Sequence, residues 1–251
     1  MNEGGLYKVS KKIKKTLVIS LIIVVAAVLG FYIYTLDYYR ADSEAQEVAA
    51  QEGSSSIIRE ENLYVFSPEE ESSTGIIFYP GGKVQATAYA PLMKELSDKG
   101  YMVVLVDMPF NLAVFDIKAA DEVIEEFPEI DKWYIAGHSL GGAMASAYAA
   151  ESSEKLQGII LLGAYPSSDL TEEDLSLLVL YGSEDKVLNR EALEENKSNS
   201  PTASKYIEIP GGNHAYFGSY GEQEGDGIAT ISPEEQRTST VEEIDGFIKE
   251  K

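Results

Sequence analysis

The chain has 251 residues, which is enough for one domain with a sizeable hydrophobic core and some additional segments. Its formal net charge of −22 repels nucleic-acid phosphate, so we expect no nucleic-acid partner. Cysteine is absent and only two histidines are present, which excludes disulfides, thiol nucleophiles, thiolate metal sites and multi-histidine metal centres. We expect neither a bound metal nor a cofactor.

The N-terminal region has the pattern of a membrane helix. Five lysines lie within residues 8–15, and residues 16–36 then run without a charge. At 1.5 Å per residue this run is about 31 Å long, enough to cross a bilayer. Because the lysines precede it, the positive-inside rule predicts a cytoplasmic segment 1–15, a single transmembrane helix 16–36 in the cell membrane and an extracytoplasmic remainder. The alternative is a cleaved signal peptide and a secreted protein, although the run is long for that.

Residues 37–56 are polar and acidic and end in Gly-Ser-Ser-Ser. We interpret them either as a partly helical stalk or as a plain disordered linker. The globular domain is then expected over residues 57–251. Residues 37–251 together carry 41 acidic and 15 basic side chains, so an anionic membrane surface repels this part of the chain and attracts the lysines.

From residue 57 onward, predicted strands alternate with predicted helices. The predicted strands are 57–66 (one strand or a hairpin pair), 75–79, 101–106, 133–136, 156–162, 177–181 and 206–209. The predicted helices are 90–96, 115–127, 143–150 and 232–250, and 189–199 forms a polar helix or a loop. Continuous apolar strands are typical of an α/β fold, with a mostly parallel central sheet covered by helices on both faces. In such a sheet the functional site lies at the carboxyl ends of the strands.

One of these strand ends carries the pattern of a nucleophile elbow. The stretch Gly137-His138-Ser139-Leu140-Gly141-Gly142 lies between the apolar strand 133–136 and the small-residue helix 143–150. A sharp strand-turn-helix presents a serine hydroxyl at the top of the sheet, and the glycines let neighbouring backbone come close. The alternative is a serine that only caps the helix. The sequence predicts Ser139 as a nucleophile.

A serine hydroxyl needs a base to take its proton, and the base needs an anion to fix its tautomer. Asp185 and His214 follow two later strands, in the chain order Ser, Asp, His that this kind of sheet uses. Nearby alternatives are Glu184, Asp169 and Asp174 for the acid and His138 for the base. A residue directly beside the nucleophile points elsewhere, so we interpret His138 as a packing residue.

The tetrahedral intermediate requires backbone N–H donors for its oxyanion. We expect one from Leu140, at the positive end of the helix that follows the elbow. The second is expected from the loop after strand 75–79, and either Gly82 or Lys83 fits.

The chain resembles the α/β-hydrolase superfamily, close to its compact dienelactone-hydrolase-like or carboxylesterase-like branch. The resemblance covers residues 57–251 and rests on the elbow and on Tyr79-Pro80-Gly81-Gly82, Gly182-Ser183-Glu184-Asp185, Gly211-Gly212-Asn213-His214 and Gly218-Ser219-Tyr220-Gly221-Glu222. It implies hydrolysis of an ester or related acyl bond through an acyl-enzyme. Many members have His-Gly where this chain has Pro80-Gly81, and dienelactone hydrolases proper use a cysteine nucleophile, which is absent here.

Only about 14 residues, 163–176, follow the strand after the elbow helix, which is too few for a large lid. We therefore expect an open, shallow site for a small acyl substrate, with candidate walls at Met108, Phe110, Tyr165, Tyr216 and Phe217. The expected function is a membrane-anchored serine hydrolase. Alternatives are an inactive binding module on the same fold, or an acyltransferase, a peptidase or a cofactor-free perhydrolase with the same catalytic residues. The sequence gives no indication of a protein partner.

Overall fold

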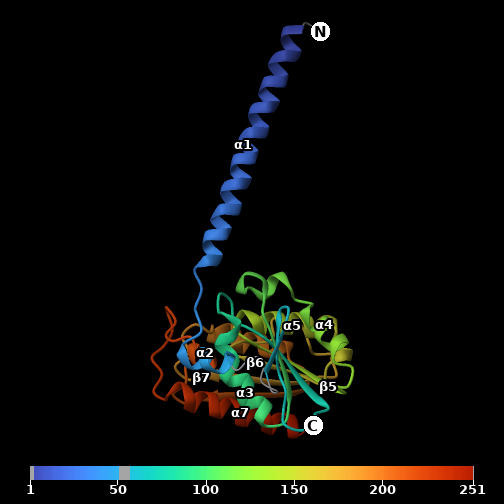
Figure 1. Cartoon of the computed structure of the whole chain (residues 1–251), viewed down its shortest axis with the longest axis vertical. Coiled ribbons are helices and arrows are strands. Elements are labelled where there is room, and N and C mark those ends of the chain that lie inside the picture. Colours follow the sequence, from blue (N-terminus) through green and yellow to red (C-terminus); the bar gives the residue numbers. More distant parts are fainter. Residues whose placement is uncertain (1–2, 51–56, 251) are drawn as a thin grey trace. The chain divides into compact units, whose positions relative to one another are not determined.

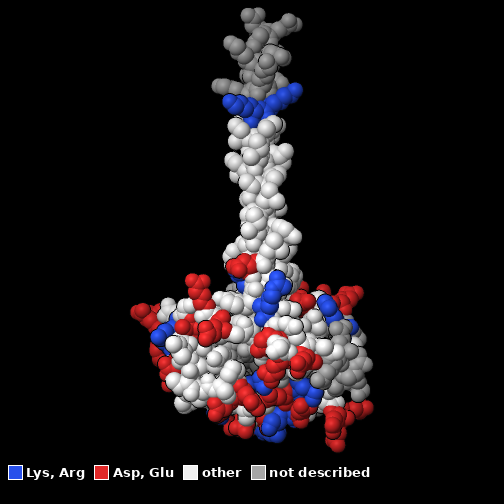
Figure 2. Space-filling view, turned by 60° about the vertical axis from the view of Figure 1, so that its left-hand side comes forward, with Lys and Arg blue, Asp and Glu red and all other residues white. Residues whose placement is uncertain are grey.

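The computed structural model describes residues 3–50 and 57–250, and the chain divides into two units, Met1–Tyr38 and Tyr39–Lys251. The first unit is the helix α1 (Glu3–Leu36), which contains the span 16–36 expected from the sequence. Within it, Ile13–Leu36 has a mean hydropathy of 2.7, and its length and composition are sufficient to cross a membrane. Its described surface is uncharged beyond Lys14 and Lys15 (Figure 2). One apolar helix near the N-terminus is consistent with an anchor or with a signal sequence.

The second unit is built on one eight-stranded sheet, of order β1-β2-β4-β3-β5-β6-β7-β8 (Figure 1). The antiparallel strands are β1 (Ile57–Glu60) and β2 (Leu63–Phe66), so the first predicted strand is a hairpin pair. The strands that pair in parallel are β3 (Thr74–Tyr79), β4 (Met102–Val106), β5 (Lys132–His138), β6 (Gly158–Leu162), β7 (Ser176–Gly182) and β8 (Ala203–Ile209). The predicted, mostly parallel α/β fold is confirmed.

Helices cover both faces of this sheet. One face carries α3 (Ala90–Asp98) and α7 (Pro233–Lys249), and the other carries α4 (Ala119–Glu126) and α5 (Leu140–Glu151) (Figure 1). Alternate residues of β3 pack into the two core layers that lie between the sheet and its helices, because successive side chains of a strand point to opposite faces. Ile76 and Phe78 pack in the first layer, whereas Ile77 and Tyr79 pack in the second. Short 3-10 turns are Ala86–Tyr89, Pro109–Asn111, Ala113–Phe115, Ser153–Lys155, Lys197–Asn199 and Ala215–Phe217.

The helix predicted over 115–127 is shorter in the structure, and the stretch 189–199, predicted as a polar helix or a loop, contains a helix. The helix expected over 115–127 begins only at Ala119, because Asp116 has φ −151° and interrupts the helical path after a 3-10 turn. Phe115 is consequently half exposed instead of lying on a buried helical face. The polar stretch 189–199 forms α6 (Arg190–Asn196), whose N-cap Asn189 accepts a 3.0 Å hydrogen bond from the Ala192 N–H.

The stalk predicted over 37–56 differs from the structure from Tyr39 to Ala50. This segment contains α2 (Ser43–Ala49) and packs on the domain, with Ala41 and Ala45 buried. The Tyr39 N–H donates to the Lys83 carbonyl at 2.8 Å, and the Gln85 N–H donates back to the Tyr39 carbonyl at 2.9 Å. The domain therefore begins at Tyr39 and not near residue 57; the rest of the predicted stalk, 51–56, lies outside the described residues.

The buried guanidinium of Arg237 explains why this acidic segment packs. Its Nη2 lies 2.7 Å from Glu44 of α2, and its Nε lies 2.6 Å from Glu95 of α3. One cation thus joins α2, α3 and α7. The composition of 37–56 gives no sign of this, because the partner is almost two hundred residues away.

Candidate active site

The turn between β5 and α5 is strained at one residue. Ser139 has φ 51° and ψ −119°, a region that costs a non-glycine residue of order 1–3 kcal/mol. Glycines on either side are required by close packing: a Cβ on Gly141 would lie 2.1 Å from the Tyr79 carbonyl oxygen, and a Cβ on Gly137 would lie 2.5 Å from the Gly141 carbonyl oxygen. The Ser139 N–H donates to the Leu162 carbonyl at 2.9 Å, which ties the turn to β6. The backbone therefore forms the sharp elbow that the sequence predicts.

The loops after β7 and β8 bring Asp185 and His214 together. His214 Nδ1 lies 2.8 Å from Asp185 Oδ2, and both side chains are buried. The other carboxylate oxygen, Oδ1, accepts the N–H groups of Val187 at 2.9 Å and Leu188 at 2.8 Å. These bonds orient the carboxylate toward the ring. The Nε2 atom of His214 has no hydrogen-bond partner among the described residues, so it is available to take a proton.

Two of the alternative acids, Glu184 and Asp169, are engaged elsewhere. The Glu184 carboxylate accepts a 3.1 Å hydrogen bond from the Ser183 hydroxyl. Asp169 accepts from the backbone and the hydroxyl of Thr171, and these bonds lower the pKa of its carboxyl group. Asp185 is the carboxylate that contacts His214.

The two amides proposed after β3 have different environments. The Lys83 N–H already donates to the Asn111 carbonyl at 2.8 Å. Gly82 instead packs against the first residue of α5: a Cβ on Gly82 would lie 2.8 Å from Leu140 Cδ2. Of the two, only the Gly82 N–H has no hydrogen bond to a described residue, and the Cα of Gly82 faces the Leu140 side chain.

Ser139, Leu140 and His214 line one cavity of about 340 Å³. Its other lining residues are small or apolar for the most part, namely Ala143, Gly163, Ala164, Tyr165, Ser167, Val187, Leu188 and Asn189. Residues 163–175, all described, join β6 to β7 with no helix, so no lid domain is inserted there. The structure thus brings the expected nucleophile, the expected base and one expected oxyanion residue to a single opening.

Of the five candidate walls, Tyr165 lines this cavity and the other four do not. Met108 is buried in the core layer under α4 and α5. Phe217 is buried in the other core layer, under α3 and α7, with its ring centroid 5.7 Å from that of His138, and Tyr216 packs against that layer. Phe110, at φ 57°, is half exposed and meets Phe115 edge to face. These four were expected at the cavity because they are large apolar residues near strand ends, but composition near a strand end does not tell which way a side chain points.

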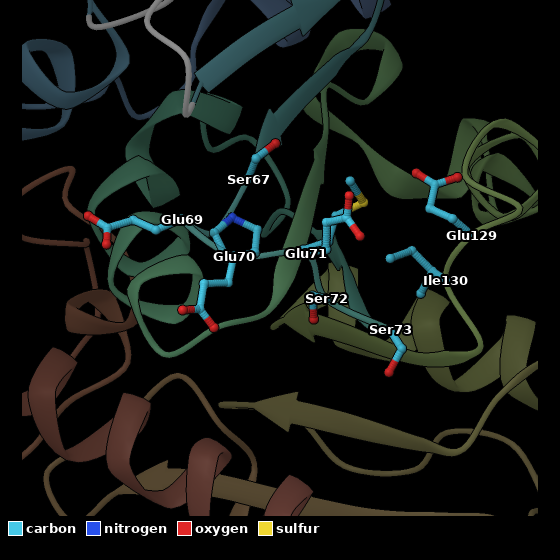
Figure 3. A pocket seen from close by; sticks show the side chains of 10 residues that line it. Ser67, Glu69, Glu70, Glu71, Ser72, Ser73, Glu129 and Ile130 are labelled. Atoms are coloured by element: carbon cyan, nitrogen blue, oxygen red, sulfur yellow. The ribbon is translucent and has the colours of Figure 1, made fainter.

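A larger pocket, of about 620 Å³, lies at the opposite end of the sheet (Figure 3). It is lined by residues 67–73, which precede β3, and by Met102, Glu129 and Ile130, at the starts of β4 and β5. Its glutamates, which include Glu69, Glu70 and Glu71, are exposed. It therefore lies at the amino ends of the parallel strands, away from Ser139 and His214.

Several supporting residues were missed from the sequence. Gln236 of α7, fully buried, accepts the Asn213 N–H at 2.9 Å and donates to the Asn213 carbonyl at 2.8 Å. Asp226 accepts the Ala215 N–H at 2.9 Å. These bonds fix the loop that carries His214. A signal existed for Gln236: it lies eight residues before Ile244 on the apolar face of the closing helix, where a polar side chain needs a partner.

Comparison with known proteins agrees with the fold. The profile of the alpha/beta hydrolase family matches residues 75–238, well over half of the chain. The chain therefore belongs to the alpha/beta hydrolase family. Membership supports hydrolysis of an ester or peptide bond as the class of chemistry.

More specific similarities are distant. A proline iminopeptidase of Saccharolobus solfataricus is 24% identical over 156 residues, which are 57% of this chain and 50% of that protein. The chain spans about half the length of the curated relatives it matches. Est1E of Butyrivibrio proteoclasticus, solved with ferulic acid bound, has a TM-score of 0.57 at 14% identity over 75% of this chain and 95% of its own. A dienelactone hydrolase of Anabaena variabilis has a TM-score of 0.56 at 16% identity over 75% and 90%. These two structures show the shared fold alone.

Proposed function

We propose that the chain is a serine hydrolase that cleaves an ester bond of a small acyl substrate through Ser139, His214 and Asp185. The observation that carries the proposal is the open Nε2 atom of His214, whose Nδ1 is engaged by Asp185, in the same cavity as a serine held in a strained elbow. Such strain persists where surrounding structure imposes it, typically at functional sites.

The chemistry follows from the roles of these groups. Ser139 Oγ attacks the substrate carbonyl while His214 Nε2 takes its proton, and Asp185 stabilises the imidazolium. The oxyanion of the tetrahedral intermediate is bound by the N–H groups of Leu140 and Gly82. His214 then protonates the leaving alcohol, and an acyl-enzyme forms. Water, activated by the same histidine, releases the acid.

The cavity favours a neutral acyl ester over a peptide N-terminus. An aminopeptidase needs an anionic group to bind the free ammonium of its substrate, and none of the described residues that line the cavity is Asp or Glu. Peptide hydrolysis is the second candidate, because the curated relatives are proline iminopeptidases. Comparing p-nitrophenyl acetate and butyrate with proline p-nitroanilide separates the two.

We also propose that α1 anchors the enzyme, with residues 1–15 in the cytoplasm and the catalytic domain outside; secretion after signal cleavage is the alternative. The acidic surface that Figure 2 shows on the visible face of the domain supports an arrangement in which only the N-terminal lysines approach anionic lipid. Protease treatment of intact cells should remove the domain and leave a membrane-bound fragment. A domain protected until the cells are lysed contradicts this topology.

The main test is Ser139→Ala in the detergent-solubilised full chain. We expect hydrolysis of short p-nitrophenyl esters to fall by about 10⁴-fold or more, together with loss of labelling by a fluorophosphonate probe. Ser239→Ala, at a partly exposed position of α7, is the control and should retain both. An active Ser139→Ala variant excludes this mechanism, and a wild-type chain that the probe does not label indicates an inactive binding module.

A further inference from the structure

The second histidine of the chain lies beside the first. His138, buried immediately before Ser139, has its ring centroid 4.5 Å from that of His214, at an interplanar angle of 46°. On the other side its Nδ1 lies 2.8 Å from the hydroxyl of Tyr89. That hydroxyl accepts the N–H of Gly81 at 3.0 Å. A buried chain of contacts thus runs from the loop that carries Gly82 to the proposed base.

Proton counting along this chain fixes the roles of its members. The Tyr89 oxygen accepts from Gly81, so its own proton needs an acceptor, and His138 Nδ1 is the atom within reach. His138 accepts this proton only when it is neutral, with its own proton on Nε2, a buried atom that has no hydrogen-bond partner among the described residues. Burial, followed by the neighbouring charge of His214, holds the pKa of His138 well below its ordinary value. Burial also raises the pKa of Tyr89, which therefore keeps its proton.

The backbone packs closely against the side chains of Tyr89, His138 and His214. A Cβ on Gly81 would lie 2.8 Å from both His138 Nδ1 and the Tyr89 hydroxyl oxygen, so only glycine fits there. A Cβ on Gly163 would lie 2.8 Å from His214 Nδ1. A displacement of His138 is therefore transmitted to the Gly81-Gly82 loop and to the ring of His214 together.

We propose that Tyr89 and His138 are positioning residues that fix the Gly82 amide and the His214 ring relative to each other across the site. The inference rests on the proposed function, because their relative position matters only if both groups act on one substrate. A neutral His138 has a further consequence: it places no positive charge against His214 when that ring becomes cationic in each half of the reaction.

The test uses the detergent-solubilised full chain and a p-nitrophenyl ester. Tyr89→Phe should lower kcat about tenfold while KM changes by less than about twofold, because misplaced donors weaken transition-state binding more than ground-state binding. The matched control is Tyr79→Phe, since Tyr79 is equally buried and its hydroxyl also accepts a backbone N–H, that of Ala120, on the opposite face of the sheet. It should lose comparable thermal stability and keep kcat within about twofold.

A second pair of variants, at His138, tests the proposal even if Tyr89→Phe does not fold. His138→Asn keeps an acceptor near the position of Nδ1, whereas His138→Leu removes it. We expect His138→Asn to retain most of kcat and His138→Leu to lose about tenfold. The Tyr89→Phe/His138→Leu double variant should be no slower than the slower single one, because the two residues act as a unit.

The outcomes separate the two proposals. Wild-type chain that is not labelled by a fluorophosphonate overturns both. Wild-type labelling with equal loss of kcat in Tyr79→Phe and Tyr89→Phe, or with additive effects in the double variant, overturns the positioning role and leaves the hydrolase proposal intact.

Discussion

The two ends of the parallel sheet carry cavities of opposite character. The amino end has the larger one, about 620 Å³, with exposed glutamates on its rim (Figure 3). The carboxyl end has a smaller one, about 340 Å³, lined mainly by apolar residues around Ser139 and His214. Cavity volume alone therefore does not indicate the end of the sheet that carries the proposed site.

What distinguishes the carboxyl end is that its polar groups are fixed and incompletely satisfied. Asp185 uses one oxygen on two backbone amides and the other on His214, and the far nitrogen of His214 has no hydrogen-bond partner in the described part of the chain. At the amino end the glutamates are exposed, so solvent satisfies their carboxylates. Preorganised groups beside a small cavity are what the proposed chemistry at the carboxyl end requires.

The largest effect is expected from a pair of isosteric amide substitutions, which test directly which end of the sheet carries the activity. Asp185→Asn should lower kcat/KM for a short ester by about 10³- to 10⁴-fold, because the amide cannot hold the tautomer of His214 that accepts the serine proton. Glu71→Gln makes the same chemical change at the larger pocket and should leave kcat/KM within about twofold. Steady-state kinetics of both variants decide the matter. A large loss in Glu71→Gln would move the site to the amino end.

A smaller effect is expected at the oxyanion loop. In Gly82→Ala the new methyl group must displace Leu140 or the loop, so both proposed donors shift and kcat should fall about tenfold. The control is Gly246→Ala on α7, where a Cβ has no described atom within 4 Å. It should leave kcat unchanged and raise stability by about 0.5–1 kcal/mol. Unaltered kcat in Gly82→Ala would exclude Gly82 as a donor.

The smallest effect is expected from a change at the segment 39–50, which pairs with Lys83 and Gln85 beside that loop. The experiment asks whether the carboxyl end of the sheet depends on this segment. Arg237→Ala removes the cation between α2, α3 and α7 and should cost about 1–2 kcal/mol in thermal or urea unfolding, less than a fully buried ion pair because Glu44 is half exposed. Activity at low temperature should change by less than twofold. Lys249→Ala, in an exposed i,i+4 pair, should cost about 0.5 kcal/mol or less. Equal losses in the two variants would show that α2 is not held by Arg237.

Much of the fold could be predicted from the sequence. The apolar runs, the breakers between them and the strand-glycine-serine-glycine-helix pattern are local, and local signals place strand ends well. The chain order of Ser139, Asp185 and His214 was predicted for the same reason, since each follows a strand directly. The helix boundary at Ala119 was missed because the apolar pattern of 115–127 continues across a backbone break that the pattern does not record.

By itself, then, the sequence determined which strands exist, which residue types stand at their carboxyl ends and that a long apolar helix precedes the domain. The tertiary structure decided that His214 binds Asp185 and not Glu184, that the Lys83 amide is engaged while that of Gly82 has no partner among the described residues, and that residues 39–50 belong to the domain. It also placed His138 between Tyr89 and His214. The reason is distance along the chain: these choices depend on contacts between segments tens to hundreds of residues apart, and only packing brings such segments together.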